Sequence, residues 1–214
     1  MIILMTCKLY KYRWQKIKDN WLDACGIPYV FVVGDETLPR GGFKHDDTDS
    51  SILYVGCKDD YDELVHKVCY AIRAVKQLYD PAFVLKIDDD VVIVPERLAA
   101  YKPNNDYEGN SLHTGTFSAW GIEKYSKPVN KQPVFFGESI NYCGGPLYCL
   151  RRRAIDIVCA EMNPDNLKFE DVNVCLTLKR HGITPTHADL FSEQPNTSAI
   201  GWHDQYHMSE QNCK

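Results

Sequence analysis

The sequence lacks an excess of basic residues and any long apolar run. Its 24 Lys and Arg residues are outnumbered by 29 Asp and Glu residues, which gives a formal net charge of −5. This balance argues against a nucleic-acid-binding surface, which requires a basic patch. No apolar run approaches the ~18 residues of a membrane span. The opening Met1-Ile2-Ile3-Leu4-Met5 is too short for the apolar region of a secretion signal and has no basic start.

Closely spaced cysteine pairs are also missing. The chain has nine cysteines, an odd number, and no two of them form a C-x-x-C pair. A zinc site is therefore not predicted, and several cysteines fall at apolar positions where a free thiol behaves as a small hydrophobic side chain. We expect a reducing compartment of the cytoplasmic type.

No internal repeat or linker divides the chain. Its 214 residues are enough for one substantial core, so we expect one domain spanning residues 1–214. Hydrophobic residues make up 44% and charged residues 25%, as in ordinary globular proteins.

The first half alternates apolar runs with helical patterns, which predicts an α/β fold with a mixed, mostly parallel sheet flanked by helices. The predicted strands are Ile2–Met5, Tyr29–Val33, Ile52–Val55 and the run from Phe83 to Ile87. The predicted helices are Tyr12–Cys25, a second one ending at Tyr79 and a short one over Glu96–Tyr101. Residues Glu36 to Ser50 are predicted to form an exposed loop.

The second half is less regular. Ser111–Phe117 and Val134–Gly137 have the composition of strands. A glycine-rich segment, Asn141–Tyr148, precedes a predicted helix near Arg152–Met162. Another helix is expected to open at Glu170-Asp171 and to stop at Gly182.

Three consecutive carboxylates, Asp88-Asp89-Asp90, follow the buried strand directly. The carboxyl ends of strands form the edge at which α/β proteins bind ligands. Because side chains two apart on an extended chain point the same way, Asp88 and Asp90 can face one object. Acids so placed predict a divalent cation, Mg²⁺ or Mn²⁺, which commonly carries a substrate phosphate. The alternative is a solvated acidic turn.

Three further features have both a functional and a structural interpretation. Gly144-Gly145 suits close approach of a sugar to the backbone, or a tight turn. Glu170-Asp171 suits catalysis, or the favourable charge of a helix start. His203 suits a metal ligand, although a lone histidine more often is not one.

Taken together and in this order, the features resemble the fringe-like β-1,3-glycosyltransferases, a family with the GT-A fold that includes galactosyl- and N-acetylglucosaminyltransferases. The similarity covers nearly the whole chain. The residues that carry it are Arg13, Trp21, Lys67, Asp88–Asp90, Gly144–Tyr148, Glu170–Val172 and His203. Small domains of this kind also occur in chloroviruses, which glycosylate their own capsids; such an origin would place the protein in the host cytoplasm.

The resemblance implies a metal-dependent glycosyltransferase that uses a UDP-sugar donor and a glycan or glycoprotein acceptor. It also implies a nucleotide-binding half, residues 1–102, and an acceptor-binding half, residues 103–214. The implied metal ligands are Asp90, Asp88 and His203, with His207 as the alternative histidine. The implied donor-binding residues are Thr6, Cys7, Lys8, Arg13, Lys67, Asp88, Asp89, Gly144 and Gly145.

For catalysis, the resemblance implies that Asp171, next to Glu170, is the general base of an inverting reaction; in a retaining enzyme it need not be. The chain departs from the family in having no membrane anchor, an odd number of cysteines and short acceptor loops. A further possibility is that the chain is one domain of a longer enzyme. Donor sugar and acceptor stay open.

Two other functional classes compete with this reading. One is a catalytically silent module that binds a nucleotide sugar or a glycan. The other is a metal-dependent phosphodiesterase or nuclease, which the acidic net charge disfavours.

Overall fold

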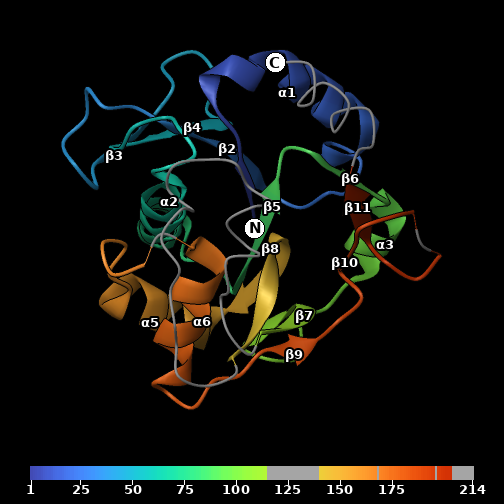
Figure 1. Ribbon diagram of the computed structural model, residues 1–214. Helices are drawn as coiled ribbons and strands as arrows, with labels where there is room; N and C mark the ends of the chain where they lie inside the picture. Colours follow the sequence, from blue (N-terminus) through green and yellow to red (C-terminus); the bar gives the residue numbers. More distant parts are fainter. Residues whose placement is uncertain (115–139, 168, 196, 204–214) are drawn as a thin grey trace.

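The computed structural model describes residues 1–114, 140–167, 169–195 and 197–203. An eight-stranded sheet runs through the molecule with helices on both faces (Figure 1). The fold class expected from the sequence, α/β with a mixed, mostly parallel sheet, is therefore confirmed.

The order of the strands across the large sheet is β3-β4-β2-β1-β5-β8-β7-β9. Strands β4, β2, β1 and β5 are parallel to one another, while β8 is antiparallel to both of its neighbours. Strand β3 is antiparallel to β4, and β9 is parallel to β7. The bounds are β1 Ile2–Met5, β2 Tyr29–Gly34, β3 Phe43–His45, β4 Ile52–Val55, β5 Phe83–Asp88, β7 Tyr107–Thr114, β8 Ile140–Arg151 and β9 Thr186–His187.

A smaller sheet, β10-β11-β6, lies beside the large one. Its strands are Phe191–Ser192, Gly201–His203 and Val91–Ile93, in that order. The helices of the described residues are η1 Lys8–Tyr10, α1 Lys11–Ile17, η2 Lys18–Leu22, α2 Leu64–Tyr79, α3 Pro95–Ala100, α5 Arg152–Glu161 and α6 Glu170–Lys179. None of them has the length and apolar character that a membrane span requires.

Alternation along the central strands divides the core into two layers. Ile3 and Met5 of β1 face the layer formed with α2, α5 and α6. Ile2 and Leu4 face the opposite layer, formed with α1, η2 and α3. In β5, Val84 belongs to the first layer, whereas Leu85 and Ile87 belong to the second. Lys86 and Asp88 follow Val84 at the period of two and so lie on the face that α6 covers.

Three predicted elements need correction. The helix expected over Tyr12–Cys25 is α1 followed by the wider π-helical turn η2, and Gly26 ends it at φ +66°. The loop from Glu36 to Ser50 contains the short edge strand β3. The glycine-rich segment Asn141–Tyr148 is part of the long strand β8, because its first three residues pair with β7 and its last two pair with β5.

Other predicted elements agree with the structure at or near both ends. The strands at Ile2–Met5 and Ile52–Val55 have the predicted bounds. Of the expected strand Ser111–Phe117, residues 111–114 belong to β7, which begins earlier, at Tyr107. Residues 115–117 and the expected strand Val134–Gly137 lie outside the described residues. All eight cysteines in the described ranges are free thiols.

Candidate active site

The carboxyl ends of β1 and β5 lie side by side and bring the first loop to the triple aspartate. Met5 of β1 is in register with Asp88 of β5, and the amide of Asp89 donates to the carbonyl of Met5. Thr6, Cys7 and Lys8 follow Met5 directly, with Cys7 half-buried before η1. The loop after β1 therefore lies beside the triple aspartate; the expectation that it binds the donor stays a prediction.

Asp88 is joined to the start of α6 by a lysine. The Lys86 ammonium, which has no exposed surface, lies 2.6 Å from Asp88 Oδ1 and 3.0 Å from Glu170 Oε1. It also donates to the carbonyl oxygen of Gly145 in β8. Glu170 in turn accepts a hydrogen bond of 3.0 Å from the buried Tyr148 hydroxyl. Three segments, β5, β8 and α6, thus meet around one cation.

The charges in this cluster shift one another's ionisation. Desolvation, with repulsion from Asp90 and Glu170, raises the pKa of Asp88 to about 8, against the opposing pull of Lys86. Burial alone would lower the pKa of Lys86, but the adjacent carboxylates of Asp88 and Glu170 outweigh it and raise the pKa. Lys86 is therefore a permanent cation in this site.

Asp171 lies in the first turn of α6, beside Gly145. Its Oδ1 accepts a hydrogen bond of 2.8 Å from the amide of Val172. A Cβ atom on Gly145 would lie 3.1 Å from Glu170 Oε1 and 3.5 Å from Asp171 Oδ2. Desolvation, with repulsion from Glu170, raises the pKa of Asp171 to about 7. Glycine thus lets the β8 backbone approach both carboxylates, and Asp171 has the ionisation behaviour of a base that works near neutral pH.

Asp89, by contrast, is bound on both of its oxygens by other residues of the chain. Its Oδ2 accepts a 2.6 Å hydrogen bond from the Thr6 hydroxyl, and its Oδ1 lies 3.1 Å from Arg13 Nη1. Trp14 Nε1 donates to the same Thr6 oxygen at 2.9 Å. Arg13 is buried and its guanidinium stacks 3.9 Å from the Tyr10 ring. Asp89, Thr6 and Arg13 were expected among the donor-binding residues; in the structure the side chains of Thr6 and Arg13 both contact Asp89.

Lys67 is also buried and paired. Its ammonium donates to Asp59 Oδ1 at 2.7 Å and to the carbonyl of Thr6 at 3.0 Å. Asp59 in turn accepts from the amides of Lys8, at 2.7 Å, and Gly34, at 2.8 Å. Lys67 was expected to offer its charge to a diphosphate; here that charge is balanced by Asp59. The pair fixes the loop after β1 against the end of β2.

Asp90 has an oxygen with no internal partner. Its Oδ1 is buried and accepts no hydrogen bond from the described residues. A buried orphaned carboxylate oxygen is costly unless something outside the chain binds it, and a hard divalent cation suits such an oxygen. Within the described ranges, no group of three or more His, Cys, Asp or Glu is arranged to hold a metal by itself. The residues therefore fit a cation that a substrate phosphate also ligates.

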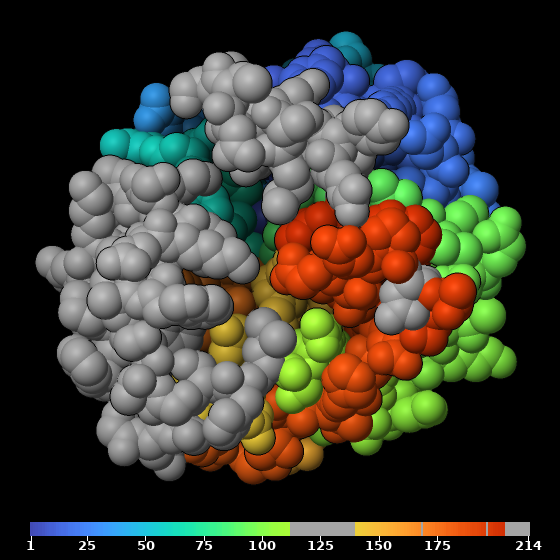
Figure 2. All heavy atoms as spheres, turned by 45° about the vertical axis from the view of Figure 1, so that its right-hand side comes forward, coloured from blue at the N-terminus to red at the C-terminus, as the bar shows by residue number. Residues whose placement is uncertain are grey.

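The C-terminal segment returns to this site. His203 in β11 is in antiparallel register with Val91, the residue after Asp90. Figure 2 shows the red segment that includes β10 and β11 lying against the green one. His203 Nδ1 lies 3.1 Å from Glu193 Oε2, and its ring packs edge-on against Phe191. A carboxylate on one ring nitrogen commonly orients the other nitrogen toward a metal. His207 lies outside the described residues.

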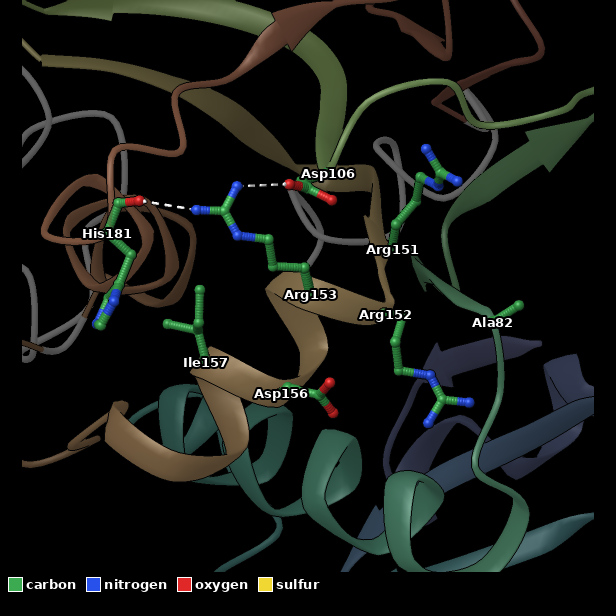
Figure 3. A pocket seen from close by; sticks show the side chains of 8 residues that line it. All are labelled: Ala82, Asp106, Arg151, Arg152, Arg153, Asp156, Ile157 and His181. Carbon is green, nitrogen blue, oxygen red and sulfur yellow. Dashed lines mark hydrogen bonds and ion pairs between the residues drawn. The ribbon is translucent and has the colours of Figure 1, made fainter.

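A hollow of about 630 Å³ lies at the end of β5 that is opposite the triple aspartate (Figure 3). Three consecutive arginines, Arg151–Arg153, line it. Arg153 pairs with Asp106 at 3.2 Å, and Arg152 pairs with Asp80. Because its charges are largely balanced and the aspartates lie at the other sheet edge, this hollow is separate from the candidate active site.

Sequence reasoning missed two residues that organise the site, Lys86 and Asp59. Lys86 stands out as the one basic residue within the strand Phe83–Asp88, two positions before Asp88 and therefore on the same face. A charged residue inside an apolar strand is a usable signal because it must be paired when buried. Asp59 gave no comparable signal, since it lies in an acidic, exposed-looking stretch.

Comparison with known proteins places the chain by sequence and relates it to several structures. Residues 11–189 match the sequence model of the family described as Galactosyltransferase. No curated protein sequence matches the chain.

Three solved structures are similar at low identity. One is a glycosyltransferase involved in the glycosylation of the major capsid of PBCV-1, with 12% identity, a TM-score of 0.47 and 98% of each chain covered. Another is the galactosyltransferase LgtC in complex with donor and acceptor sugar analogues, with 10% identity, a TM-score of 0.46, and 95% of this chain and 86% of that chain covered. The third, mouse xyloside xylosyltransferase 1, has 9% identity, a TM-score of 0.42, and coverage of 95% and 96%.

Proposed function

The chain belongs to the galactosyltransferase family, and on that premise we propose that it transfers a sugar from a UDP-sugar donor to a hydroxyl group of a glycan or glycoprotein. The reaction is proposed to depend on Mn²⁺ or Mg²⁺ and to invert the anomeric centre, as in the fringe-like enzymes. The observation that carries the proposal is that Lys86 joins Asp88, in the triple aspartate, to Glu170, the residue before Asp171.

In this proposal Asp90 holds the cation, with Asp88 and His203 as further ligands. The orphaned oxygen of Asp90 and the Glu193–His203 pair support the assignment. When bound, the cation would stabilise the negative charge that develops on the leaving diphosphate.

Asp171 is proposed to take the proton of the acceptor hydroxyl. A general base must be deprotonated before the reaction and must bind the proton as the acceptor oxygen attacks, so a pKa near the working pH is favourable. The pKa of Asp171, raised to about 7 mainly by desolvation, meets this requirement. Glu170 is fixed by Lys86 and Tyr148, so we propose that it orients the start of α6 while Asp171 reacts.

The donor is proposed to lie along the loop after β1. The loop that contains Thr6, Cys7 and Lys8 is held by Asp89 from one side and by Lys67 and Asp59 from the other. A preorganised backbone binds a nucleotide without paying the entropy of ordering the loop. The contributions of Arg13 and Lys67 would be to hold this loop in place, and Gly144-Gly145 would let the sugar approach the backbone of β8.

The proposal is tested by UDP release from a panel of UDP- and GDP-sugars in the presence of Mn²⁺, Mg²⁺ or EDTA. Slow hydrolysis of one UDP-sugar that EDTA abolishes would support the enzyme and name the donor. Metal-dependent UDP binding without turnover of any donor, with or without candidate acceptors, would favour a binding module. Phosphodiester cleavage without any sugar nucleotide would favour the phosphodiesterase alternative.

A further inference from the structure

We infer that Lys86 is a positioning residue that sets the geometry between the donor-side carboxylate and the helix that carries the base. This inference rests on the proposed function. It goes beyond that function by giving one buried cation, Lys86, the role of holding two parts of the site at a fixed separation. One part is Asp88 in the first half of the chain, and the other is the start of α6 in the second half.

The Lys86 ammonium lies among three oxygen atoms. Its Nζ donates to the carbonyl oxygen of Gly145 and lies 2.6 Å from Asp88 Oδ1 and 3.0 Å from Glu170 Oε1. Two carboxylates and one carbonyl therefore hold this cation in place. Each acceptor belongs to a different element: β5, α6 and β8.

Each partner of Lys86 adjoins a residue with a proposed chemical role. Asp88 adjoins the metal-binding end of the triple aspartate, and its side chain keeps 29% of its surface exposed. Glu170 immediately precedes Asp171, and its side chain is only 5% exposed. Gly145 lies against both carboxylates of that helix start. A displacement of Lys86 would therefore change the separation of donor and base, while the loop after β1 would keep its own contacts with Asp89, Lys67 and Asp59.

This division predicts which kinetic constant depends on Lys86. Misplacement of reacting groups by about 1 Å can cost roughly 10²-fold in rate. Removal of Lys86 should therefore lower kcat for transfer by about 10²-fold, with a much smaller change in UDP affinity and in the KM for the donor. Transfer to an acceptor should fall more than donor hydrolysis, because water reaches the anomeric carbon without the same alignment.

The experiment compares Lys86→Met with Lys76→Met, a matched control. Lys76 also bridges two carboxylates, Asp80 at 2.6 Å and Asp156 at 2.7 Å, but it lies on α2 away from the candidate active site. For both variants we would measure the unfolding midpoint, Mn²⁺-dependent UDP affinity, kcat, donor KM and the ratio of transfer to hydrolysis. We expect kcat and the transfer ratio to fall in Lys86→Met alone.

Because Lys86→Met leaves two acids facing each other, a second variant keeps the test informative if that protein folds poorly. Lys86→Met/Glu170→Gln removes one of these two facing charges and retains an oxygen for the Tyr148 hydroxyl. If Lys86 acts through Glu170, Lys86→Met and Glu170→Gln alone should each reduce kcat, and the double variant should lose less than the product of their separate effects. Unchanged kcat and transfer ratio in folded Lys86→Met would overturn the inference and leave the proposed function intact.

A readout without turnover covers the case in which no acceptor is found. Binding of UDP with Mn²⁺ should slow amide hydrogen exchange at the start of α6 in the wild type and in Lys76→Met. The same protection should be absent in Lys86→Met/Glu170→Gln. Equal protection in all three proteins would overturn the coupling, and absence of UDP binding to the wild type would remove the proposed function together with the inference.

Discussion

Asp89 and Arg13 form a buried ion pair, 3.1 Å long, between the triple aspartate and α1. Asp88, one residue earlier, pairs with Lys86 on the opposite face of β5. Asp90, one residue later, has a buried oxygen that accepts no hydrogen bond from the residues that the structure describes. The three consecutive acids therefore have different environments: Asp88 is paired within the α6 layer, Asp89 is paired with α1, and Asp90 keeps an oxygen that these residues do not satisfy.

Replacement of Asp89 should mainly cost stability. Asp89→Asn keeps an oxygen for the Thr6 hydroxyl but leaves the buried Arg13 without its counter-charge. Removal of one partner of a buried pair costs about 3–5 kcal/mol, and the remaining stacking of Arg13 on Tyr10 places our expectation at the lower end. Chemical unfolding of the wild type and the variant measures the difference. A decrease in the free energy of unfolding of less than about 1 kcal/mol, as for exposed ion pairs, would contradict a stabilising role for Asp89.

Replacement of Asp90 should instead affect ligand binding. Asp90 Oδ1 accepts no hydrogen bond from the described residues, so we expect Asp90→Asn to cost little stability. Because the variant also loses the negative charge proposed to hold the cation, we expect its UDP affinity not to depend on Mn²⁺. Titration calorimetry of UDP with Mn²⁺ and with EDTA measures this dependence. Asp89→Asn, measured under conditions in which it is folded, serves as the control at the neighbouring position. Retention of the full Mn²⁺ effect in Asp90→Asn would remove Asp90 from the cation site.

Gly145→Ala should disturb the carboxylates of Glu170 and Asp171 directly. The added Cβ would lie 3.1 Å from Glu170 Oε1, and Glu170 cannot easily retreat because Lys86 and Tyr148 hold it. Overpacking of this kind costs about 1–3 kcal/mol, and we expect kcat to fall with it.

Gly26→Ala is the matched control for that experiment. Gly26 has φ +66° and no atom within 4 Å of an added Cβ, so its replacement costs stability through backbone strain alone. The control should lose stability and keep kcat. Equal kcat in both variants would show that the closeness of Gly145 to the acids has no catalytic consequence.

The raised pKa of Asp171 predicts a pH-dependent effect on stability. A folded-state pKa of about 7, above the ordinary value, means that the folded protein binds this proton more tightly than the unfolded chain does. The associated stability is present in acid and is lost as the pH rises through about 7. Asp171→Asn removes the cost of ionising the group, so at pH 8 the variant should be more stable than the wild type.

The size of that effect follows from linkage. The rise in the pKa of Asp171 to about 7 corresponds to a change of roughly 4 kcal/mol at most in the free energy of unfolding. Because Asp171 is only half-buried, screening by solvent reduces our expectation to about 2 kcal/mol. Because the loss begins above the ordinary pKa of about 4 and is complete near pH 7, unfolding measured at pH 4 and pH 8 should show a clearly larger advantage of the variant at the higher pH. An equal difference at both values would contradict the raised pKa.

Local sequence signals were sufficient for much of residues 1–102. Ile2–Met5 and Ile52–Val55 are short apolar runs bounded by polar residues, and the structure gives these strands the predicted bounds. The position of Glu170-Asp171 at a helix start also agrees. These features depend on patterns within a few residues, which is why the sequence alone predicts them.

Features that depend on distant partners were not predicted. Gly144-Gly145-Pro146 has turn composition, yet it lies inside β8 because the residues on either side pair with neighbouring strands: Cys143 with β7, Leu147 with β5, and Tyr148 with both. The pairing of β7 with β8 skips between Gly109 and Ser111, which accommodates the irregular residues. Lys86 was overlooked for the same reason, since its partner Glu170 lies in a helix far along the chain.

The most direct test of the account is release of UDP from the accepted donor, measured beside UDP binding in the wild type, Asp90→Asn and Asp171→Asn. We predict metal-dependent release by the wild type, loss of both release and metal-dependent binding in Asp90→Asn, and loss of release with retained binding in Asp171→Asn. Release at the wild-type rate by both variants would contradict the account.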